Sequence, residues 1–338
     1  MMASHSPRCT ESEMESRART VPARPRYSRV ASRSSMMGAE MSTSLFIAKS
    51  SDREFIRREA TPLVPGAADL EDLASDTLSR FIAAAPPGTL ERRFALAHAL
   101  RVLREGGELI ALAPKAKGGA RLRKELEAFG CAVHETARHH HRLCLTHRPV
   151  APEGLDEAIE QGALQFAPRL GLWSQPGVFS WDRIDPGSAL LLETKPEFAG
   201  AGADLGCGVG LLGKALLSSP AVTSLTLLDI DHRAIAAARR NIDDPRAAFL
   251  HADVRSAAGK ITDLDFVIMN PPFHDGGRED RSLGQAFIAA AAKMLRKGGV
   301  CRLVANVALP YEPALIAHFA TVCLIAQARG YKVHEARK

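Results

Sequence analysis

The sequence predicts an α/β protein whose C-terminal half is a mainly parallel, Rossmann-like sheet covered on both faces by helices. Three observations predict this fold. Apolar segments alternate with helical ones beyond about residue 200, the first of them runs into a glycine-rich turn, and polar side chains follow successive apolar segments. Strands that alternate with crossover helices form parallel sheets, whose carboxyl ends share one edge.

The elements of this half are expected in a regular order. Parallel strands are expected at 202–207, 224–229, 247–253, 264–270 and 300–306. Helices are expected at 209–218, 231–242, 281–296 and 311–320. Residues 321–336 are expected to form an antiparallel hairpin, so the sheet would have seven strands.

The N-terminal half repeats part of this pattern. RFIAAAPPG at 80–88 and DFVIMNPPF at 265–273 both run from an apolar strand into two prolines. A helix follows each, and then LREGGELIALAPK at 103–115 corresponds to LRKGGVCRLVANV at 295–307. The similarity favours an internal duplication over a coincidence between two ordinary α/β units.

The two copies differ where chemistry is expected. The second copy has Asn270 where the first has Ala85, and the first copy has no glycine-rich turn upstream. The first copy would therefore keep the scaffold and lose the chemistry. We expect four parts: a disordered basic tail at 1–42, a degenerate copy at 43–148 with a substrate-binding or structural role, a linker at 149–176 and a catalytic domain at 177–338.

Length and composition narrow the class of protein. The chain has 338 residues, of which 46% are hydrophobic and 24% charged, and no apolar run long enough for a membrane span. The formal net charge of +6 favours a polyanionic partner. The six cysteines are scattered without a C-x-x-C pair, so we expect neither a zinc site nor a disulfide framework, and a reducing cytoplasm as the location.

The segment DLGCGVG, which begins at Asp204, is the expected cofactor turn. Gly206, Gly208 and Gly210 would let the backbone approach a ligand at the N-terminus of a helix. An aspartate two residues before the first glycine is characteristic of proteins that bind S-adenosylmethionine. A dinucleotide dehydrogenase is the nearest alternative, but its fingerprint has a glycine where Leu211 stands.

Two further acids end the next expected strands. Asp229 could accept from two ribose hydroxyls, and Asp253 from an adenine amine. Both would lie with Asp204 at the carboxyl ends of strands, where open α/β sheets bind ligands. The residues that follow the two acids, Ile230 and Val254, complete this part of the predicted cofactor site.

The fourth expected strand ends in Asn270-Pro271-Pro272-Phe273 at the same edge. The Asn270 side-chain oxygen and the Pro271 carbonyl would be two acceptors on a turn that proline stiffens. They suit a planar –NH₂ group, because holding its hydrogens frees a delocalised lone pair to attack a sulfonium methyl. Positioning and electrostatics would then carry the rate without a metal. Phe273 could stack on a flat base, which is worth about 1–3 kcal/mol.

Four stretches together carry a family resemblance: DLGCGVGLLG, NPPFHDG, VFSWDRIDPGSALLLE and RLVANVALPYE. They resemble the ribosomal RNA guanine-N2 methyltransferases of the RsmC/RlmG type over about residues 170–338. The first half is similar to that family's degenerate methyltransferase-like domain. The resemblance implies S-adenosylmethionine as cofactor, and as target the N2 amine of a guanine in 16S rRNA of the small ribosomal subunit. One departure is Val307-Ala308, where a basic or histidine pair is expected.

The resemblance also implies site residues outside the two turns. The set expected at the mouth of the site is Phe179, Asp185, Gly187 and Ser188, with Ser188 assigned to the cofactor. Their alternative role is to cap a helix at 188–194. The set expected to contact the substrate is Pro272, Phe273, His274 and Tyr311.

Other polar segments have a structural and a functional interpretation. The run His139-His140-His141 is expected to be a solvated strand end rather than a metal or RNA site. Trp173 and Trp181 are expected to pack rather than to stack on bases. The basic stretch after the first copy's last strand either grips phosphates or is a solvated helix face: Lys115, Lys117, Arg121, Arg123 and Lys124.

Residues 1–42 are rich in arginine and lack the apolar segment of a secretory signal. They are expected to be a disordered tail or an over-extended start, with a basic RNA-binding arm as the alternative. Deletion of 1–40 should leave activity intact.

Three alternatives to the guanine-N2 reaction in 16S rRNA stay open. Asn-Pro-Pro-Phe is shared with adenine-N6 and glutamine-N5 methyltransferases, so the target could be another nucleic acid amine, a guanine of 23S rRNA among them, or a release-factor glutamine. The glutamine enzymes usually have tyrosine where Phe273 stands. A non-enzymatic RNA-binding factor is disfavoured by the intact Asp204, Asp229 and Asn270. The sequence does not fix the oligomeric state, for which we favour a monomer.

Overall fold

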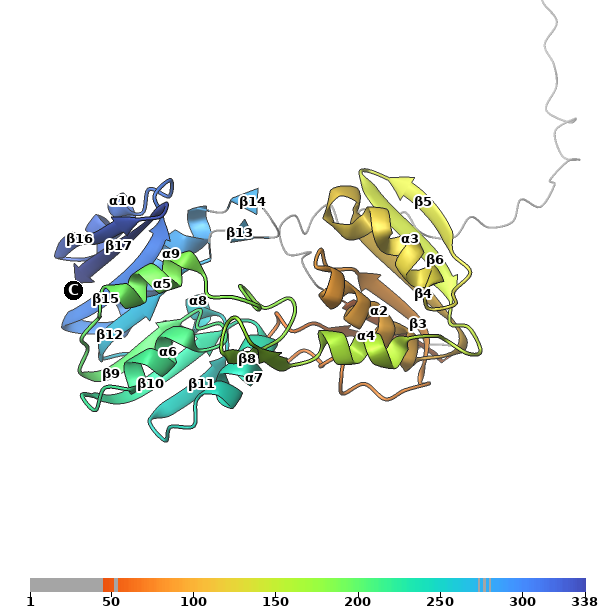
Figure 1. Cartoon of the computed structure of the whole chain (residues 1–338), viewed down its shortest axis with the longest axis horizontal. Coiled ribbons are helices and arrows are strands. Elements are labelled where there is room, and N and C mark those ends of the chain that lie inside the picture. The colour runs from red at the N-terminus through yellow and green to blue at the C-terminus, as the bar shows by residue number, and fades with distance from the viewer. Residues whose placement is uncertain (1–44, 52–53, 273, 276–277, 280) are drawn as a thin grey trace, which may run out of the picture. The chain divides into compact units, whose positions relative to one another are not determined.

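The computed structural model describes residues 45–51, 54–272, 274–275, 278–279 and 281–338. They form two α/β halves, one built on strands β1–β6 and the other on strands β9–β12 and β15–β17 (Figure 1). Two earlier expectations, the disordered tail at 1–42 and the roles of Phe273, lie outside the described residues. No helix in the described part of the chain is long and apolar enough to cross a membrane.

The second half contains the expected seven-stranded sheet, in the order β11-β10-β9-β12-β15-β17-β16. Its first five strands in this order are parallel, and β17 and β16 are antiparallel. The predicted fold class is therefore confirmed. The strands are β9 (Gly200–Leu205), β10 (Val222–Asp229), β11 (Ala247–His251), β12 (Leu264–Met269), β15 (Leu295–Asn306), β16 (Thr321–Ala328) and β17 (Tyr331–Arg337).

Helices cover both faces of this sheet because its strands alternate their apolar side chains between two cores. Phe266 and Ile268 of β12 pack with one set of helices, and Val267 and Met269 with the other. The first set is α5 (Pro186–Glu193), α6 (Leu211–Leu217) and α7 (His232–Asn241). The second set is α8 (Val254–Ala257), α9 (Arg281–Met294) and α10 (Glu312–His318).

The first half has a six-stranded sheet in the order β2-β1-β3-β4-β6-β5. Only β3 and β4 pair in parallel within it; the other described pairs are antiparallel. The strands are β1 (Leu45–Ser51), β2 (Glu54–Ala60), β3 (Leu78–Ala84), β4 (Leu103–Pro114), β5 (His134–Arg138) and β6 (His141–His147). The helical segments are α2 (Thr89–Val102), η1 (Lys115–Gly119) and α3 (Ala120–Glu127).

Part of the first sheet has the same topology as part of the second. The series β3-β4-β6-β5 matches β12-β15-β17-β16 in order and in strand direction. Both series also have a register shift one residue into their first strand. At this shift a glycine of the second strand lies close to the carbonyl of the first residue of the first strand. A Cβ added at Gly107 would be 3.1 Å from Leu78 O, and one added at Gly299 would be 3.0 Å from Leu264 O.

The segment expected as a linker, 149–176, contains folded elements. Helix α4 (Leu155–Gly162) packs against α2, where Gly162 lies directly on the ring of Phe94. Strands β7 (Gln165–Ala167) and β8 (Leu172–Ser174) follow it as an antiparallel pair. A second short pair, β13 (His274–Asp275) and β14 (Arg278–Glu279), follows β12.

Candidate active site

The glycine-rich turn joins β9 to α6. Its amides at Gly206 and Cys207 donate to the Leu228 carbonyl of β10, at 2.8 and 3.0 Å. Gly208 has a φ of +52°, and an added Cβ there would meet no atom within 4 Å. The backbone at Gly208 therefore borders open space, as a turn that approaches a ligand requires. Burial raises the pKa of the Cys207 thiol well above its ordinary value, which agrees with a filler role.

Asp204 at the end of β9 is fully buried beneath this turn. Its Oδ2 accepts a hydrogen bond from the Gly213 amide of α6 at 3.0 Å. Its Oδ1 has no hydrogen-bond partner among the described residues. Burial raises the pKa of Asp204 to about 7. An unpartnered buried carboxylate oxygen is costly unless a ligand supplies a donor.

Asp229 at the end of β10 is tied to the glycine turn. Its Oδ2 accepts from the Gly208 amide at 2.8 Å, and its Oδ1 accepts from the Asp231 amide at 2.9 Å. Burial raises the pKa of Asp229 to about 6. Ile230 beside it is 38% exposed, so an apolar side chain faces solvent next to the acid.

Asp253 at the end of β11 already has a partner. Its carboxylate caps the N-terminus of α8 and binds the guanidinium of Arg255, with 2.9 Å between Oδ2 and Nε. These hydrogen bonds from Arg255 lower the pKa of Asp253. Val254 is buried in the core, so its side chain is not offered to a ligand. Neither residue lines the cavity beside the glycine turn.

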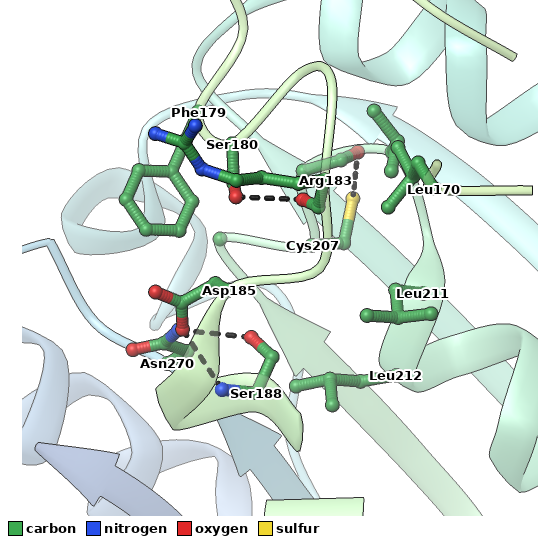
Figure 2. A pocket seen from close by; sticks show the side chains of 13 residues that line it. Leu170, Phe179, Ser180, Arg183, Asp185, Ser188, Cys207, Leu211, Leu212 and Asn270 are labelled. Atoms are coloured by element: carbon green, nitrogen blue, oxygen red, sulfur yellow. Dashed lines mark hydrogen bonds between the residues drawn. The ribbon is translucent and has the colours of Figure 1, made fainter. Parts of the chain in front are cut away.

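Asn270, directly after β12, is held by two residues at the start of α5. Its Nδ2 donates to Asp185 Oδ2 and to Ser188 Oγ, at 2.9 Å each. Asp185 Oδ2 also accepts from the Ser188 amide at 2.8 Å and thereby caps α5. Figure 2 shows the Asn270 nitrogen turned toward Asp185 and its oxygen turned away.

One cavity brings Asn270 and the glycine turn together. It has about 460 Å³ of empty space, including the solvent at its mouth. It therefore brings together site residues that the sequence predicted in the glycine turn, directly after β12 and at the start of α5. Its lining consists of Leu170, Phe179, Ser180, Arg183, Asp185, Ser188, Gly206, Cys207, Gly208, Val209, Leu211, Leu212 and Asn270 (Figure 2).

The sequence analysis assigned no site role to seven of these residues. Four of them belong to the glycine turn or directly follow it: Cys207, Val209, Leu211 and Leu212. Ser180 and Arg183 lie within the stretch VFSWDRIDPGS, so their position in that stretch was the available signal. Leu170 precedes β8 and carries no signal of its own. Phe179, which the resemblance did place at the mouth, is 60% exposed there.

The residues expected to contact the substrate lie in different environments. Pro271 is buried and Pro272 is exposed. Tyr311 is fully buried in the core, so its side chain is not accessible for direct substrate contact. An added Cβ at Gly284 of α9 would meet the Tyr311 hydroxyl, which shows how tightly the ring is enclosed. His274 begins β13, next to Phe273, which is not described.

The structure gives the environments of the histidine run and of one of the two tryptophans. His139 and His140 are exposed, and their positive φ values of 46° and 63° place them in the β5–β6 turn. Among the residues with defined positions no cluster of His, Cys, Asp or Glu could hold a metal ion. Trp173 packs: Asn241 bonds its backbone, and the Arg240 guanidinium lies 4.7 Å from the centre of its ring.

Comparison with known proteins gives concordant matches. Residues 169–335 match the family model described as methyltransferase small domain. Ribosomal RNA small subunit methyltransferase C of Pseudomonas entomophila (strain L48) is 33% identical over 265 residues, which is 75% of this chain and 77% of the relative. The same-named protein of Pseudomonas paraeruginosa (strain DSM 24068 / PA7) is 35% identical over 240 residues, covering 69% and 71% of the two chains.

A solved structure extends the match to both halves of the fold. The T. thermophilus 16S rRNA N2 G1207 methyltransferase, RsmC, in complex with AdoMet and guanosine superposes with a TM-score of 0.68. The sequence identity is 31%, and the match covers 80% of this chain and 76% of that one. The chain therefore belongs to the ribosomal RNA small subunit methyltransferase C family. Its glycine turn, strand-end acids and Asn-Pro-Pro agree with this membership.

Proposed function

We propose that this protein transfers a methyl group from S-adenosylmethionine to the exocyclic N2 amine of a guanine in 16S rRNA. The observation that carries the proposal is the amide of Asn270. Its nitrogen is bonded to Asp185 and Ser188, which leaves its oxygen free to accept, at the edge of the cavity beside the glycine turn. The T. thermophilus relative is a 16S rRNA N2 G1207 methyltransferase, and the guanosine in its complex supports the same reaction here.

The described residues fit an adenosine-type cofactor with an amino acid tail. Asp229 lies where a carboxylate can accept from ribose hydroxyls, and Ile230 offers an exposed apolar side chain for the adenine. The buried Oδ1 of Asp204 needs a donor, which a cofactor ammonium would supply directly or through water. The adenine amine would compete with Arg255 for Asp253, so this contact is the weakest of the set.

S-adenosylmethionine, when bound, supplies a methyl group on a sulfonium that is displaced directly. Asn270 Oδ1 and the Pro271 carbonyl accept the two hydrogens of the target amine. They thereby hold its nitrogen lone pair toward the methyl group, and no covalent enzyme intermediate is formed. The methylated amine is cationic and loses its proton afterwards, so no strong base is needed. Catalysis is then a matter of positioning and electrostatics.

Aromatic residues at the mouth would hold the base. We assign Phe273 and the exposed Phe179 to stacking on the guanine, and His274 to contact with the base or a phosphate. Pro272 stiffens the loop that carries Phe273. Because Tyr311 is buried, we assign it a structural role instead of a substrate contact. It packs against α9, the helix that follows the loop after β12. A paired guanine would first have to leave its stack.

The first half is best interpreted as a degenerate methyltransferase-like domain that helps to hold RNA. Its exposed cations and histidines gather at one end of the sheet, since the Lys115 amide bonds the His140 carbonyl at 2.8 Å. Lys115 follows β4, Arg121 lies in α3 and Arg138 ends β5. We expect these side chains to contact RNA phosphates. We also expect the protein to act as a monomer in the cytoplasm.

The deciding experiment is transfer of tritiated methyl from S-adenosylmethionine to unmethylated 16S rRNA, free and in 30S particles, with nucleoside analysis. Label in N2-methylguanosine is the expected result. Label in adenosine would keep the site and overturn the target base. Label only in a co-incubated release factor would identify a glutamine methyltransferase, and label only in 23S rRNA would move the substrate to the large subunit.

A further inference from the structure

We propose that Asp185 and Ser188 are positioning residues that fix the Asn270 amide with its oxygen, and never its nitrogen, toward the target amine. This inference rests on the proposed function and adds to it the means by which an amine is selected. The two residues come from the start of α5, 85 and 82 residues before Asn270 in the chain.

The hydrogen bonds leave the Asn270 amide one orientation. The amide nitrogen has two hydrogens, and both are used: one by Asp185 Oδ2 at 2.9 Å and one by Ser188 Oγ at 2.9 Å. An ionised carboxylate can only accept hydrogen bonds. A flipped amide would set its oxygen against that nearly buried carboxylate and would remove one of the two donors that Asp185 Oδ2 has, which is costly.

The orienting groups are themselves held rigidly. Asp185 is 8% exposed and caps α5 through the Ser188 amide, and Pro186 begins the helix. Gly187 packs closely against the ring of Tyr331 in β17: an added Cβ would be only 2.8 Å from that ring. Leu190 and Leu191 anchor the helix in the core. Asp185 therefore has little freedom to follow a rotating Asn270.

The fixed orientation determines which group the site accepts. Guanine carries an exocyclic amine, which donates, and a carbonyl oxygen, which only accepts. An oxygen at the Asn270 tip bonds the amine, whereas a flipped nitrogen would bond the carbonyl and turn the reactive amine away. A cap alone would need only an acceptor for the Ser188 amide, so the contacts to Asn270 are a second task of Asp185.

The activity test compares three variants with the wild type for kcat, for the KM of S-adenosylmethionine and for thermal stability. Asp185→Ala should lower kcat about tenfold to a hundredfold, and Ser188→Ala about threefold to tenfold, with little change in KM. Asp185→Asn keeps an acceptor for both donors and should restore most of the kcat. Since the backbone cap survives in Ser188→Ala, its loss of kcat would not come from an unfolded α5.

A fourth variant separates positioning from capping. Asn270→Asp still offers an oxygen to the target amine, and it leaves the cap between Asp185 and the Ser188 amide in place. It would, however, set a second carboxylate against Asp185 instead of a donor, so kcat should fall at least about a hundredfold near pH 8. A kcat near that of the wild type would overturn the proposal.

A second readout needs neither RNA nor turnover. The chain contains three asparagines, Asn241, Asn270 and Asn306, so ¹⁵N-asparagine labelling gives three side-chain amide signals. Asn241, whose nitrogen donates to two carbonyls, is the internal control. The Asn270 amide should exchange slowly with solvent in the wild type and at least about tenfold faster in Asp185→Ala, with Asn241 unchanged. Equal exchange in both proteins would overturn the proposal.

The two proposals fail in different ways. A wild-type protein that makes no N2-methylguanosine would refute the target while the exchange experiment still decides the orientation of Asn270. A wild-type protein that makes N2-methylguanosine, with kcat unchanged in Asp185→Ala and Ser188→Ala, would refute the positioning role alone.

Discussion

The ends of β3 and β12 occupy equivalent places in two sheets of the same local topology, and the end of β12 borders the cavity beside the glycine turn. Both strands run into two prolines, of which the first is buried and the second exposed. After β12 comes Asn270, whose nitrogen donates to Asp185 and Ser188 and whose oxygen is turned away from Asp185. After β3 comes Ala85, which is buried and whose amide bonds the Leu112 carbonyl of β4 at 2.8 Å.

A buried ion pair occupies the strand end in the first half. The guanidinium of Arg92 binds both oxygens of Glu125 at 2.6 Å, and it donates to the Pro86 and Pro87 carbonyls. Arg92 is 1% exposed, and an added Cβ at Gly118 would collide with it. The carbonyls that could serve an amine substrate are thus satisfied from within the protein.

The two halves also differ on the other side of the shared series of strands. In the second half β12 pairs with β9, and β9 and β10 carry the glycine turn, Asp204 and Asp229. In the first half β3 pairs instead with β1 of an antiparallel hairpin. A shared strand order therefore does not make a site; the side chains at the strand ends and the neighbouring strands decide its chemistry.

Breaking the ion pair of the first half should have the largest effect. Arg92→Ala would leave Glu125 charged and buried without a partner, so we expect the free energy of unfolding to fall by about 3–5 kcal/mol. Urea titration followed by circular dichroism measures it. The exposed pair of Arg123 and Glu127 is the control, since solvent screens it and Arg123→Ala should change the free energy of unfolding far less. Equal losses of unfolding free energy in both variants would contradict the structural role assigned to the buried pair of Arg92 and Glu125.

Making the second strand end resemble the first should remove catalysis and spare cofactor binding. Asn270→Ala deletes the acceptor for the target amine, so we expect at least about a hundredfold lower methyl transfer. The affinity for S-adenosylmethionine, measured by titration calorimetry, should change by less than about threefold. Asn306→Ala at the end of β15 is the control, because that side chain bonds only the Ala308 amide in the described structure. Near-normal turnover of Asn270→Ala would refute the acceptor role.

Asp229 lies at the end of β10, a strand without a counterpart in the first half, and its substitution tests the cofactor site. Asp229→Ala removes a carboxylate that we assign to the ribose and that also holds the Gly208 amide. The dissociation constant of S-adenosylmethionine should rise about tenfold to a hundredfold by titration calorimetry. Asp244, in the turn after α7, is a matched control whose carboxylate is bound to Arg246. An unchanged affinity in Asp229→Ala would remove the residue from the cofactor site.

Asp204 should make the stability of the protein depend on pH. With the pKa of its carboxyl raised to about 7, the folded protein binds more protons than the unfolded chain between about pH 4 and pH 7. Its contribution is fully present at lower pH and is lost as the pH rises through that window. Relative to Asp204→Asn, the ligand-free wild type should lose about 2–3 kcal/mol from about pH 5 to pH 8.

Thermal unfolding of both proteins at the two pH values measures this difference. The variant should also bind S-adenosylmethionine more weakly, since it has no carboxylate for the proposed ammonium contact. Parallel stability profiles for the two proteins would show that Asp204 titrates normally.

The sequence by itself determined the features that depend on local periodicity and on strand ends. The seven-stranded sheet of the second half follows from alternating apolar segments. The glycine turn and Asn270 line one cavity, and Asp204 and Asp229 lie at the same edge of the sheet, because parallel strands end there. The similarity of the two halves could also be predicted, since Gly107 and Gly299 repeat the same bulge.

Only the tertiary structure decided how the side chains around this frame are partnered and buried. The contact of Asp185 and Ser188 with Asn270, and that of Arg92 with Glu125, join residues 33 to 85 positions apart, which no local pattern encodes. Tyr311 resembled a substrate contact in sequence but is enclosed by α9. The physical reason is that a strand end fixes where a residue lies, whereas packing between distant segments fixes which atoms it offers.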